Sequence, residues 1–173
     1  MAQDESYAVD VGGLLAGAAK AIASVRYCWL VTMSETSALV ARPMGRLAGD
    51  PEDDDWTIRF ITDARSRKAS DIRRAGKVAL VFQREADDAY VALSGAAALR
   101  ESASYVRSRW KGAYDVYFPT DEDRANAAFA EVEAERMELW IRGVTPEPFG
   151  LQPTILERDA GAWRLRPYPR AAA

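Results

Sequence analysis

The chain has 173 residues, of which 49% are hydrophobic and 28% are charged, and its formal net charge is −3. This length suits one substantial hydrophobic core and is short for two, so we expect a single domain over residues 1–173 with frayed tails at 1–10 and 167–173. A slightly acidic chain excludes broad nucleic-acid binding, which needs an excess of lysine and arginine.

Histidine is absent, and the only cysteine is Cys28. A Ser-His-Asp triad and most zinc sites therefore lack their usual base or ligands, and one cysteine forms no disulfide framework. Cys28 stands within an apolar strand pattern, which indicates a buried small side chain rather than a reactive thiol.

The N-terminal segment predicts a helix and neither a secretory signal nor a membrane span. Residues 1–6 are acidic, and no run reaches the roughly 18 apolar residues that a span needs. We therefore expect a soluble, cytoplasmic protein with no membrane partner. The helix is predicted within 11–25, and the face expected to pack on the rest of the fold consists of Leu14, Leu15, Ala18, Ala19 and Ile22.

Two strand patterns follow at 27–33 and 38–44, joined by a turn at 34–37, and the second strand carries Arg42. A further strand is predicted at 56–62. The loop before it is crowded with acids, which is typical of a solvated turn rather than a metal site. These acids are Asp50, Glu52, Asp53, Asp54 and Asp55.

The strand at 56–62 leads into hydroxyls and cations where a helix begins. Ser66, Arg67 and Lys68 fall at the turn, and 69–76 forms a short helix that glycine ends. A helix N-terminus offers unpaired backbone N–H groups, and these side chains add a hydroxyl, a guanidinium fork and a point charge. The segment predicts a site for one phosphate group; the plain alternative is a solvated helix face.

Strand patterns resume at 77–83 and 89–100. Two helices are then predicted at 101–110 and 121–132, separated by an aromatic loop. A strand at 137–144 follows, with Met137, Leu139 and Ile141 on one face and Trp140 on the other. The proline-bearing stretch 145–153 predicts a bend. A last hairpin is expected from 154–157 and 162–166 around a turn at 158–161, and Trp163 is a core residue or a ring contact.

Four motifs occur in a specific order and spacing: Ala41-Arg-Pro-Met44, Phe60-Ile-Thr-Asp-x-x-Ser-Arg-Lys68, Val78-Ala-Leu-Val-Phe82 and Tyr90-Val-Ala-Leu-Ser-Gly95. Together they resemble the pyridoxamine 5'-phosphate oxidase-like flavoproteins, and the closest branch is the general stress protein 26 group. The resemblance covers about residues 20 to 142. It implies a mainly β fold with flanking helices (α+β), a split β-barrel, and a homodimer that holds FMN at the subunit interface.

The resemblance also implies which residues contact FMN. At the phosphate they are Arg42, Ser66, Arg67 and Lys68. Beneath the flavin and along the isoalloxazine edge they are Thr62, Asp63, Pro43 and Met44. Gln83 contacts the polar edge of the ring or is an ordinary strand-end amide.

Aromatic residues near the C-terminal half are candidates to complete the cleft. The loop at 111–119 resembles a segment that reaches toward the partner's flavin; its aromatics and the preceding tryptophan contact the flavin cleft or else pack a second small core. They are Trp110, Tyr114, Tyr117 and Phe118. Trp140 is the candidate lent to the neighbouring subunit's flavin or to the dimer surface.

The activity implied by the resemblance is that of an FMN-dependent oxidoreductase with a small-molecule electron donor or acceptor. The stretch 157–167 lacks the arginine and histidine pair of true pyridoxamine 5'-phosphate oxidases, so we do not expect that reaction. No side chain is an evident catalytic group. The alternatives are a non-catalytic flavin-binding stress protein, a split-barrel relative that uses deazaflavin or haem, and a module for another phosphorylated ligand.

Overall fold

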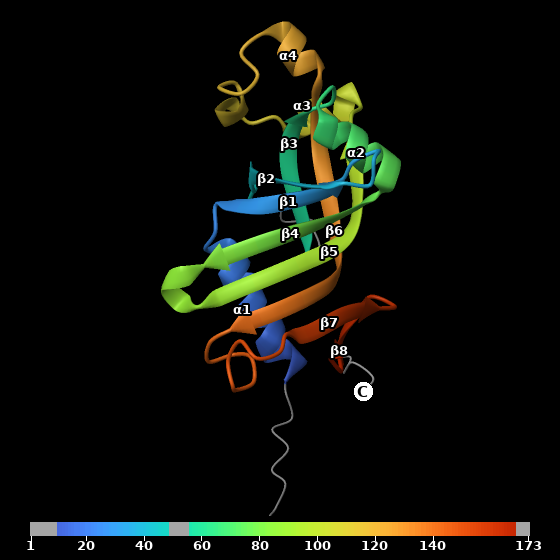
Figure 1. Ribbon diagram of the computed structural model, residues 1–173. Coiled ribbons are helices and arrows are strands. Elements are labelled where there is room, and N and C mark those ends of the chain that lie inside the picture. Colours follow the sequence, from blue (N-terminus) through green and yellow to red (C-terminus); the bar gives the residue numbers. More distant parts are fainter. Residues whose placement is uncertain (1–9, 49–55, 169–173) are drawn as a thin grey trace, which may run out of the picture. The chain divides into compact units, whose positions relative to one another are not determined.

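The structure is a computed structural model that describes residues 10–48 and 56–168 (Figure 1). The acidic loop lies outside the described residues, as do the predicted tails except for Asp10, Pro167 and Tyr168. The described chain forms two compact units. The central unit comprises 26–48, 56–81 and 93–135, and the terminal unit comprises 10–25, 82–92 and 136–168.

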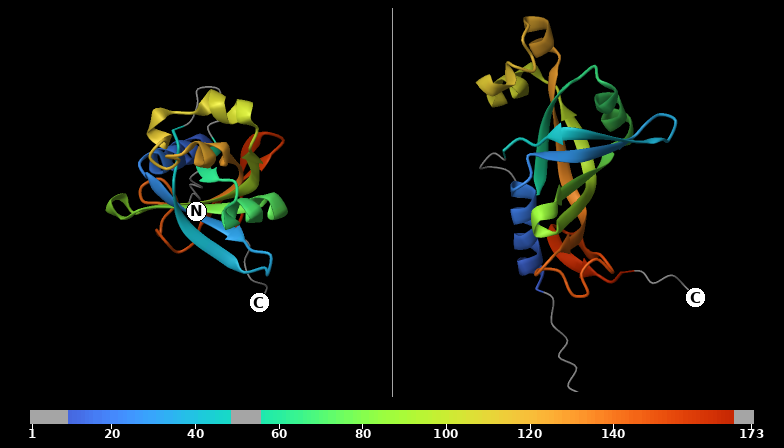
Figure 2. Two further views of the ribbon diagram at one scale, coloured as in Figure 1. Left: turned by 90° about the horizontal axis from the view of Figure 1, so that it is seen from above. Right: turned by 60° about the vertical axis from the view of Figure 1, so that its left-hand side comes forward.

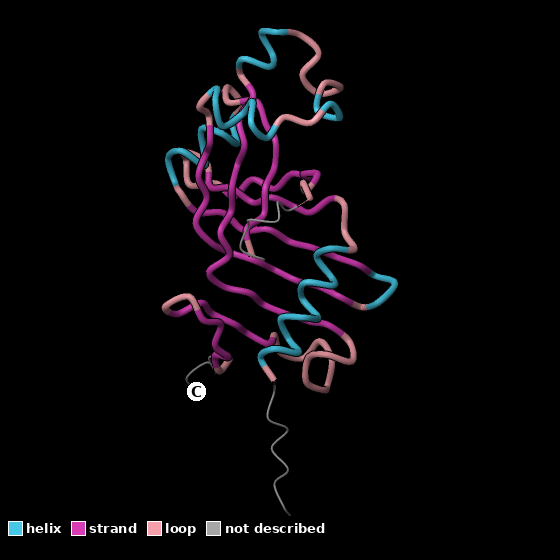
Figure 3. Tube along the Cα trace, turned by 180° about the vertical axis from the view of Figure 1, so that it is seen from behind, coloured by secondary structure: helices cyan, strands magenta, loops and turns pink. Residues whose placement is uncertain are grey.

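The regular structure is mainly antiparallel sheet, with helices between the strands (Figure 3). Hydrogen bonding gives the strand order β2-β1-β4-β5-β6-β7-β8, and β3 pairs with β6. The strands are β1 (Tyr27–Met33), β2 (Leu39–Gly45), β3 (Thr57–Asp63), β4 (Lys77–Arg84), β5 (Ala89–Arg100), β6 (Ala127–Ile141), β7 (Thr154–Asp159) and β8 (Ala162–Arg166). The helices are α1 (Val11–Ala23), α2 (Arg67–Ala75), α3 (Ala103–Arg109) and α4 (Asp121–Ala125), with 3₁₀ turns η1 (Glu85–Asp87) and η2 (Gly112–Tyr114).

The β1–β2 hairpin of the central unit confirms the predicted pair of strands (Figure 2). Its register places Trp29 opposite Pro43 and Leu30 opposite Arg42. Along β1 the side chains alternate, and Cys28, Leu30 and Thr32 are buried. Cys28 is a buried free cysteine, and burial raises the pKa of its thiol to about 12, so the expectation of an unreactive thiol is confirmed.

The predicted helix at 121–132 is wrong beyond its first turn. A capping box between Thr120 and Asp123 starts α4 as expected, but the helix ends at Ala125 and β6 begins at Ala127. Residues 127–132 are all buried, and they pair with β3 from Asp63↔Ala127 to Ile58↔Val132. Alanine is the strongest helix former, but intrinsic propensity is a weak preference, and sheet pairing together with burial on both faces outweighs it.

The terminal unit contains α1, whose buried face differs slightly from the predicted one. Leu14, Ala18 and Ile22 are buried as expected, but Ala19 is exposed and Ala21 is buried instead. At Gly17 the helix lies so close to its neighbour that an added Cβ would stand 2.7 Å from Val144 Cγ1. Neither α1 nor any other helix among the described residues is long and apolar enough to cross a membrane.

The C-terminal part of β6 shows the predicted alternation, but the strand ends at Ile141 instead of continuing to 144. Met137, Leu139 and Ile141 are buried on one face of β6, and Trp140 is half-buried on the other. The last hairpin, β7–β8, turns through Ala160 and Gly161, which have φ values of 47° and 83°. Trp163, on β8, is half-buried.

Candidate functional site

The segment between β3 and α2 leads into the N-terminus of α2 and carries several polar side chains. Ser66 has extended backbone geometry, and its Oγ accepts a hydrogen bond from the Ala69 N–H at 3.4 Å, as an N-cap residue does. Thr62 is buried at the end of β3, with its Oγ1 3.4 Å from Ser66 Oγ. At the other end, Gly76 closes α2 with a φ of 62°, a conformation that suits glycine. The predicted strand, turn and helix are thereby confirmed.

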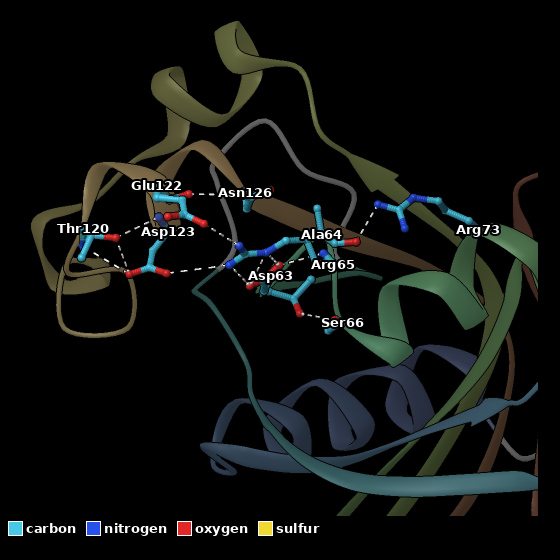
Figure 4. A network of polar contacts seen from close by, with 10 residues as sticks. Asp63, Ala64, Arg65, Ser66, Arg73, Thr120, Glu122, Asp123 and Asn126 are labelled. Atoms are coloured by element: carbon cyan, nitrogen blue, oxygen red, sulfur yellow. Dashed lines mark hydrogen bonds and ion pairs between the residues drawn. The ribbon is translucent and has the colours of Figure 1, made fainter.

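Five cations at 65–74 form a basic cluster: Arg65, Arg67, Lys68, Arg73 and Arg74. Two of its arginines, Arg65 and Arg73, connect neighbouring segments of the fold (Figure 4). Arg65 binds Asp63, with Nη2 2.7 Å from Oδ2, and its Nη1 lies 3.3 Å from Oε1 of Glu122 on α4. Arg73 pairs with Glu101 and donates to the Ala64 carbonyl at 2.8 Å. These contacts join segments that are distant in sequence. Arg65 and Arg73 are thus engaged in ion pairs within the protein, and Asp63 is an ion-pair partner of Arg65.

Two other cations of the cluster are differently placed. Within 10–48 and 56–168, the side chains of Arg67 and Lys68 have no hydrogen-bond acceptor or ion-pair partner. Arg67 is exposed, whereas Lys68 is half-buried. Burial lowers the pKa of the Lys68 ammonium, and the nearby charge of Arg42 lowers it further against the opposing effect of Asp63. The start of α2 therefore carries a partly buried positive charge close to a second cation.

Arg42 approaches this cluster from β2. Its Nη1 donates to Thr32 Oγ1 at 2.9 Å, and its Nη2 lies 3.8 Å from Asp71 Oδ2. The guanidinium is partly covered, with 21% of the side chain exposed. A cation on β2 and another on α2 are thus held near each other, although 26 positions separate them in the sequence.

A cavity of about 270 Å³ opens beside these residues in the central unit. Its lining includes Arg42, Arg67, Ser70 and Asp71, whereas Thr62, Ser66 and Lys68 do not line it. Pockets that enclose a whole small-molecule ligand measure about 300–1,000 Å³. This cavity is therefore of a size for the charged end of a larger ligand.

The other predicted contact residues are spread over both units. In the central unit Pro43 is exposed and Met44 is half-buried opposite Cys28. Gln83 and Trp140 belong to the terminal unit. Gln83 is exposed and its Nε2 donates to Glu85 Oε1 at 3.0 Å, the arrangement of a strand-end amide.

Three of the four loop aromatics form a small apolar cluster inside the central unit. Trp110 meets Tyr114 and Phe118 edge to face, with ring centroids 5.8 and 5.7 Å apart, and Tyr114 packs on Phe129 in the same way. Tyr114 and Phe118 are buried, whereas Tyr117 is 63% exposed. Of the two alternatives for these aromatics, a flavin contact or a second small core, the structure shows the small core for Trp110, Tyr114 and Phe118.

A second polar cluster escaped the sequence analysis altogether. Glu131, on β6, is buried and accepts from Arg59 and Arg100, each at 2.7 Å, and from the Tyr105 hydroxyl. With Arg109 these residues line a cavity of about 580 Å³. A glutamate between alanine, phenylalanine and valine in 128–132 is the one sequence signal for it, because a buried carboxylate requires cationic partners.

The fold is a small antiparallel β-sheet with cations at the start of α2. This arrangement places the chain among small β-sheet proteins with a candidate anion site. The chain belongs to the pyridoxamine 5'-phosphate oxidase-like family: the family model matches residues 16–146. The fold is consistent with the split barrel of these proteins. No curated protein matches the chain.

Solved structures with the same fold come from several bacteria. A Clostridium acetobutylicum protein related to general stress protein 26 has a TM-score of 0.67 at 16% identity, covering 83% of this chain and 94% of its own. General stress protein 26 of Bacillus anthracis has a TM-score of 0.62 at 19% identity, covering 83% and 98%. A pyridoxamine 5'-phosphate oxidase-related, FMN-binding protein of Nostoc punctiforme has a TM-score of 0.66 at 15% identity, covering 92% and 97%.

Proposed function

We propose that this protein binds FMN, with the phosphate held by Arg42, Ser66, Arg67 and Lys68. The observation that carries the proposal is the half-buried Lys68 ammonium, which lies near Arg42 and has no anionic partner within 4.0 Å among the described residues. A doubly charged phosphate would supply the missing charge and accept charge-assisted hydrogen bonds. Ser66 and the first N–H groups of α2 add donors at the same place.

The donor set fits the cofactor in kind. A compact cluster of cations and a hydroxyl suits a phosphate, while Pro43 and Met44, next to Arg42 on β2, offer apolar surface for a flat ring. Family membership and the FMN-binding relative from Nostoc punctiforme favour FMN over other phosphorylated ligands.

We further propose that two copies of the chain share the cofactor. One face of the β1–β2 hairpin is apolar and exposed: Tyr27, Trp29 and Leu39 are 54%, 49% and 76% accessible. Register places Met33 opposite Leu39 and Trp29 opposite Pro43 on this face. A continuous apolar face of this kind marks an interaction surface. The cavity at Arg42 is smaller than a whole flavin requires, which supports a second wall from a partner subunit.

Charging the hairpin face is expected to separate the dimer. Trp29→Lys combined with Leu39→Lys would place two positive charges on the hairpin face of each subunit, so the two faces would repel each other. By analytical ultracentrifugation we expect the variant to be a monomer and the unmodified chain to be a dimer. Leu151→Lys is the control, because Leu151 is 71% exposed in the loop between β6 and β7. An unmodified chain that sediments as a monomer would refute the dimer.

The activity that we propose is oxidation and reduction of a small molecule at the bound flavin. FMN would supply the redox chemistry, accepting and returning electrons. The protein's residues would bind the phosphate, orient the ring along β2 and limit the access of water. Reduction of the bound flavin by NADH or NADPH, followed by turnover with an added acceptor, tests for an enzyme; binding without reduction by any donor would leave a flavin-binding stress protein.

Removal of the Lys68 ammonium tests the phosphate site directly. We expect Lys68→Ala to weaken FMN binding by about 1.5–3 kcal/mol, or about 10- to 150-fold in Kd, because a hydrogen bond to a charged group is lost. Riboflavin, which lacks the phosphate, should bind the variant and the unmodified protein alike. Lys20→Ala, an exposed lysine on α1, is the matched control. Equal FMN affinity in Lys68→Ala would refute the assignment of the phosphate site.

A further inference from the structure

We propose that Asp71 and Thr32 are positioning residues that fix the guanidinium of Arg42 for phosphate binding. The inference rests on the proposed function and concerns residues that themselves contact no phosphate. It assigns a role to a buried carboxylate that sequence analysis did not single out.

The three side chains form a hydrogen-bonded relay with a defined direction. Thr32 Oγ1 lies 2.7 Å from Asp71 Oδ2 and 2.9 Å from Arg42 Nη1. An ionised carboxylate accepts only and a guanidinium donates only, so the single hydroxyl proton goes to Asp71 and an oxygen lone pair faces Arg42. Thr32 is 1% exposed and Asp71 is 9% exposed, so water competes little for these bonds. The orientation of the Arg42 fork is therefore set through Thr32.

Direct attraction between Arg42 and Asp71 is the weaker part of the arrangement. Their nearest charged atoms are 3.8 Å apart, longer than a hydrogen bond, and Arg74 lies at the same distance from the other carboxylate oxygen. Arg74 also donates to the main-chain carbonyl of Met33, at the end of β1. Asp71, through Thr32 and Arg42, and Arg74, through Met33, thus tie α2 to the β1–β2 hairpin.

This tie joins the two halves of the phosphate site. Arg42 comes from β2, whereas Ser66, Arg67 and Lys68 come from the start of α2. Arg42 and Lys68 are like charges held near each other, and burial first and the charge of Arg42 second lower the pKa of Lys68. The carboxylate of Asp71 beside Arg42 offsets this repulsion, and Arg42 also lines the cavity.

The sign of the effect separates positioning from simple charge. Asp71 carries negative charge beside a proposed anion site, so charge counting alone predicts that Asp71→Asn would bind FMN more tightly. Positioning predicts the opposite, because the amide is a weaker acceptor than the carboxylate and releases Arg42 and Thr32. Glu35, which lines the same cavity outside the relay, provides the comparison through Glu35→Gln.

The experiment measures Kd for FMN and for riboflavin in the unmodified protein and in Asp71→Asn, Thr32→Val, Thr32→Ser and Glu35→Gln, after circular dichroism shows each to be folded. We expect Asp71→Asn and Thr32→Val to weaken FMN binding about tenfold, the scale on which outer hydrogen-bond partners tune a bound group. Riboflavin affinity should change less than twofold. Thr32→Ser keeps the hydroxyl and should bind FMN as tightly as the unmodified protein does. Glu35→Gln should not weaken FMN binding.

Several outcomes would overturn the inference. FMN affinity that is unchanged or improved in both Asp71→Asn and Thr32→Val would leave the phosphate site standing and remove the positioning role. Equal losses for FMN and riboflavin would assign the relay to general structure. Should Asp71→Asn fail to fold, Thr32→Val and its serine counterpart decide alone. An unmodified protein without affinity for FMN would refute the proposed function itself, and the inference with it.

Discussion

Glu131→Ala is expected to lower the free energy of unfolding by about 3 kcal/mol at neutral pH. Removing one member of a buried ion pair costs about 3–5 kcal/mol, and the lower end applies because Arg100 remains 49% exposed. In the variant, Arg59 and Arg100 would face each other without the carboxylate, and the Tyr105 hydroxyl would lose its acceptor.

The same residue should dominate the response to acid. Burial opposes ionisation of Glu131, but hydrogen bonds from Tyr105, Arg100 and Arg59 outweigh it and lower the pKa from its ordinary 4.5 to about 2. Because the folded-state pKa is depressed, this stabilisation is present above about pH 4.5 and is lost as the pH falls toward 2. The difference corresponds to about 3 kcal/mol.

Urea unfolding from neutral pH down to about pH 3 measures both effects. We expect a steep acid limb in the unmodified protein and a flatter one in Glu131→Ala. Glu133→Ala is the matched control, since Glu133 is exposed two positions along β6. Equal losses from both substitutions would show that the buried cluster contributes little.

Gly95→Ala is expected to destabilise the central unit by about 3 kcal/mol, at the upper end of the cost of overpacking. A Cβ at Gly95, on β5, would stand 1.9 Å from the Glu133 carbonyl oxygen and 2.9 Å from its carbonyl carbon on β6. Those atoms are main chain in a strand, so they cannot move aside as the end of a flexible side chain can. The two strands would have to separate at this point.

Thermal unfolding monitored by circular dichroism tests the Gly95 prediction. Gly112→Ala is the control, because a Cβ there meets no atom within 4 Å. A melting temperature for Gly95→Ala as high as that of the control would mean that β5 and β6 are less closely apposed than the structure places them.

Local patterns predicted the elements whose signals are local. Alternation and turn residues identified the β1–β2 and β7–β8 hairpins, and the end of the strand pattern followed by a terminating glycine identified α2. The prediction for the start of β6 was wrong because the alanines in Ala127–Val132 favour a helix locally. This segment is a strand because it pairs with β3. Pairing partners more than sixty positions away leave no local trace.

The basic cluster shows the same limit for the site. Five cations lie close together in the sequence at 65–74, but which of them form ion pairs depends on carboxylates that are distant in the sequence. Arg65 and Arg73 are engaged by Glu122 and Glu101, and Asp71 reaches back to Thr32 on β1. Local spacing therefore located the candidate site without resolving which of its charges are committed.

The most direct test of FMN binding is a fluorescence-quenching titration of the unmodified protein with FMN and riboflavin side by side. We expect saturable binding of one FMN per chain, at least about tenfold tighter than riboflavin, because the phosphate would meet Arg42 and Lys68. Equal affinities would contradict the phosphate site. If neither flavin binds, the proposed function is contradicted. Arg67 and Lys68 would then be interpreted as the solvated face of a helix.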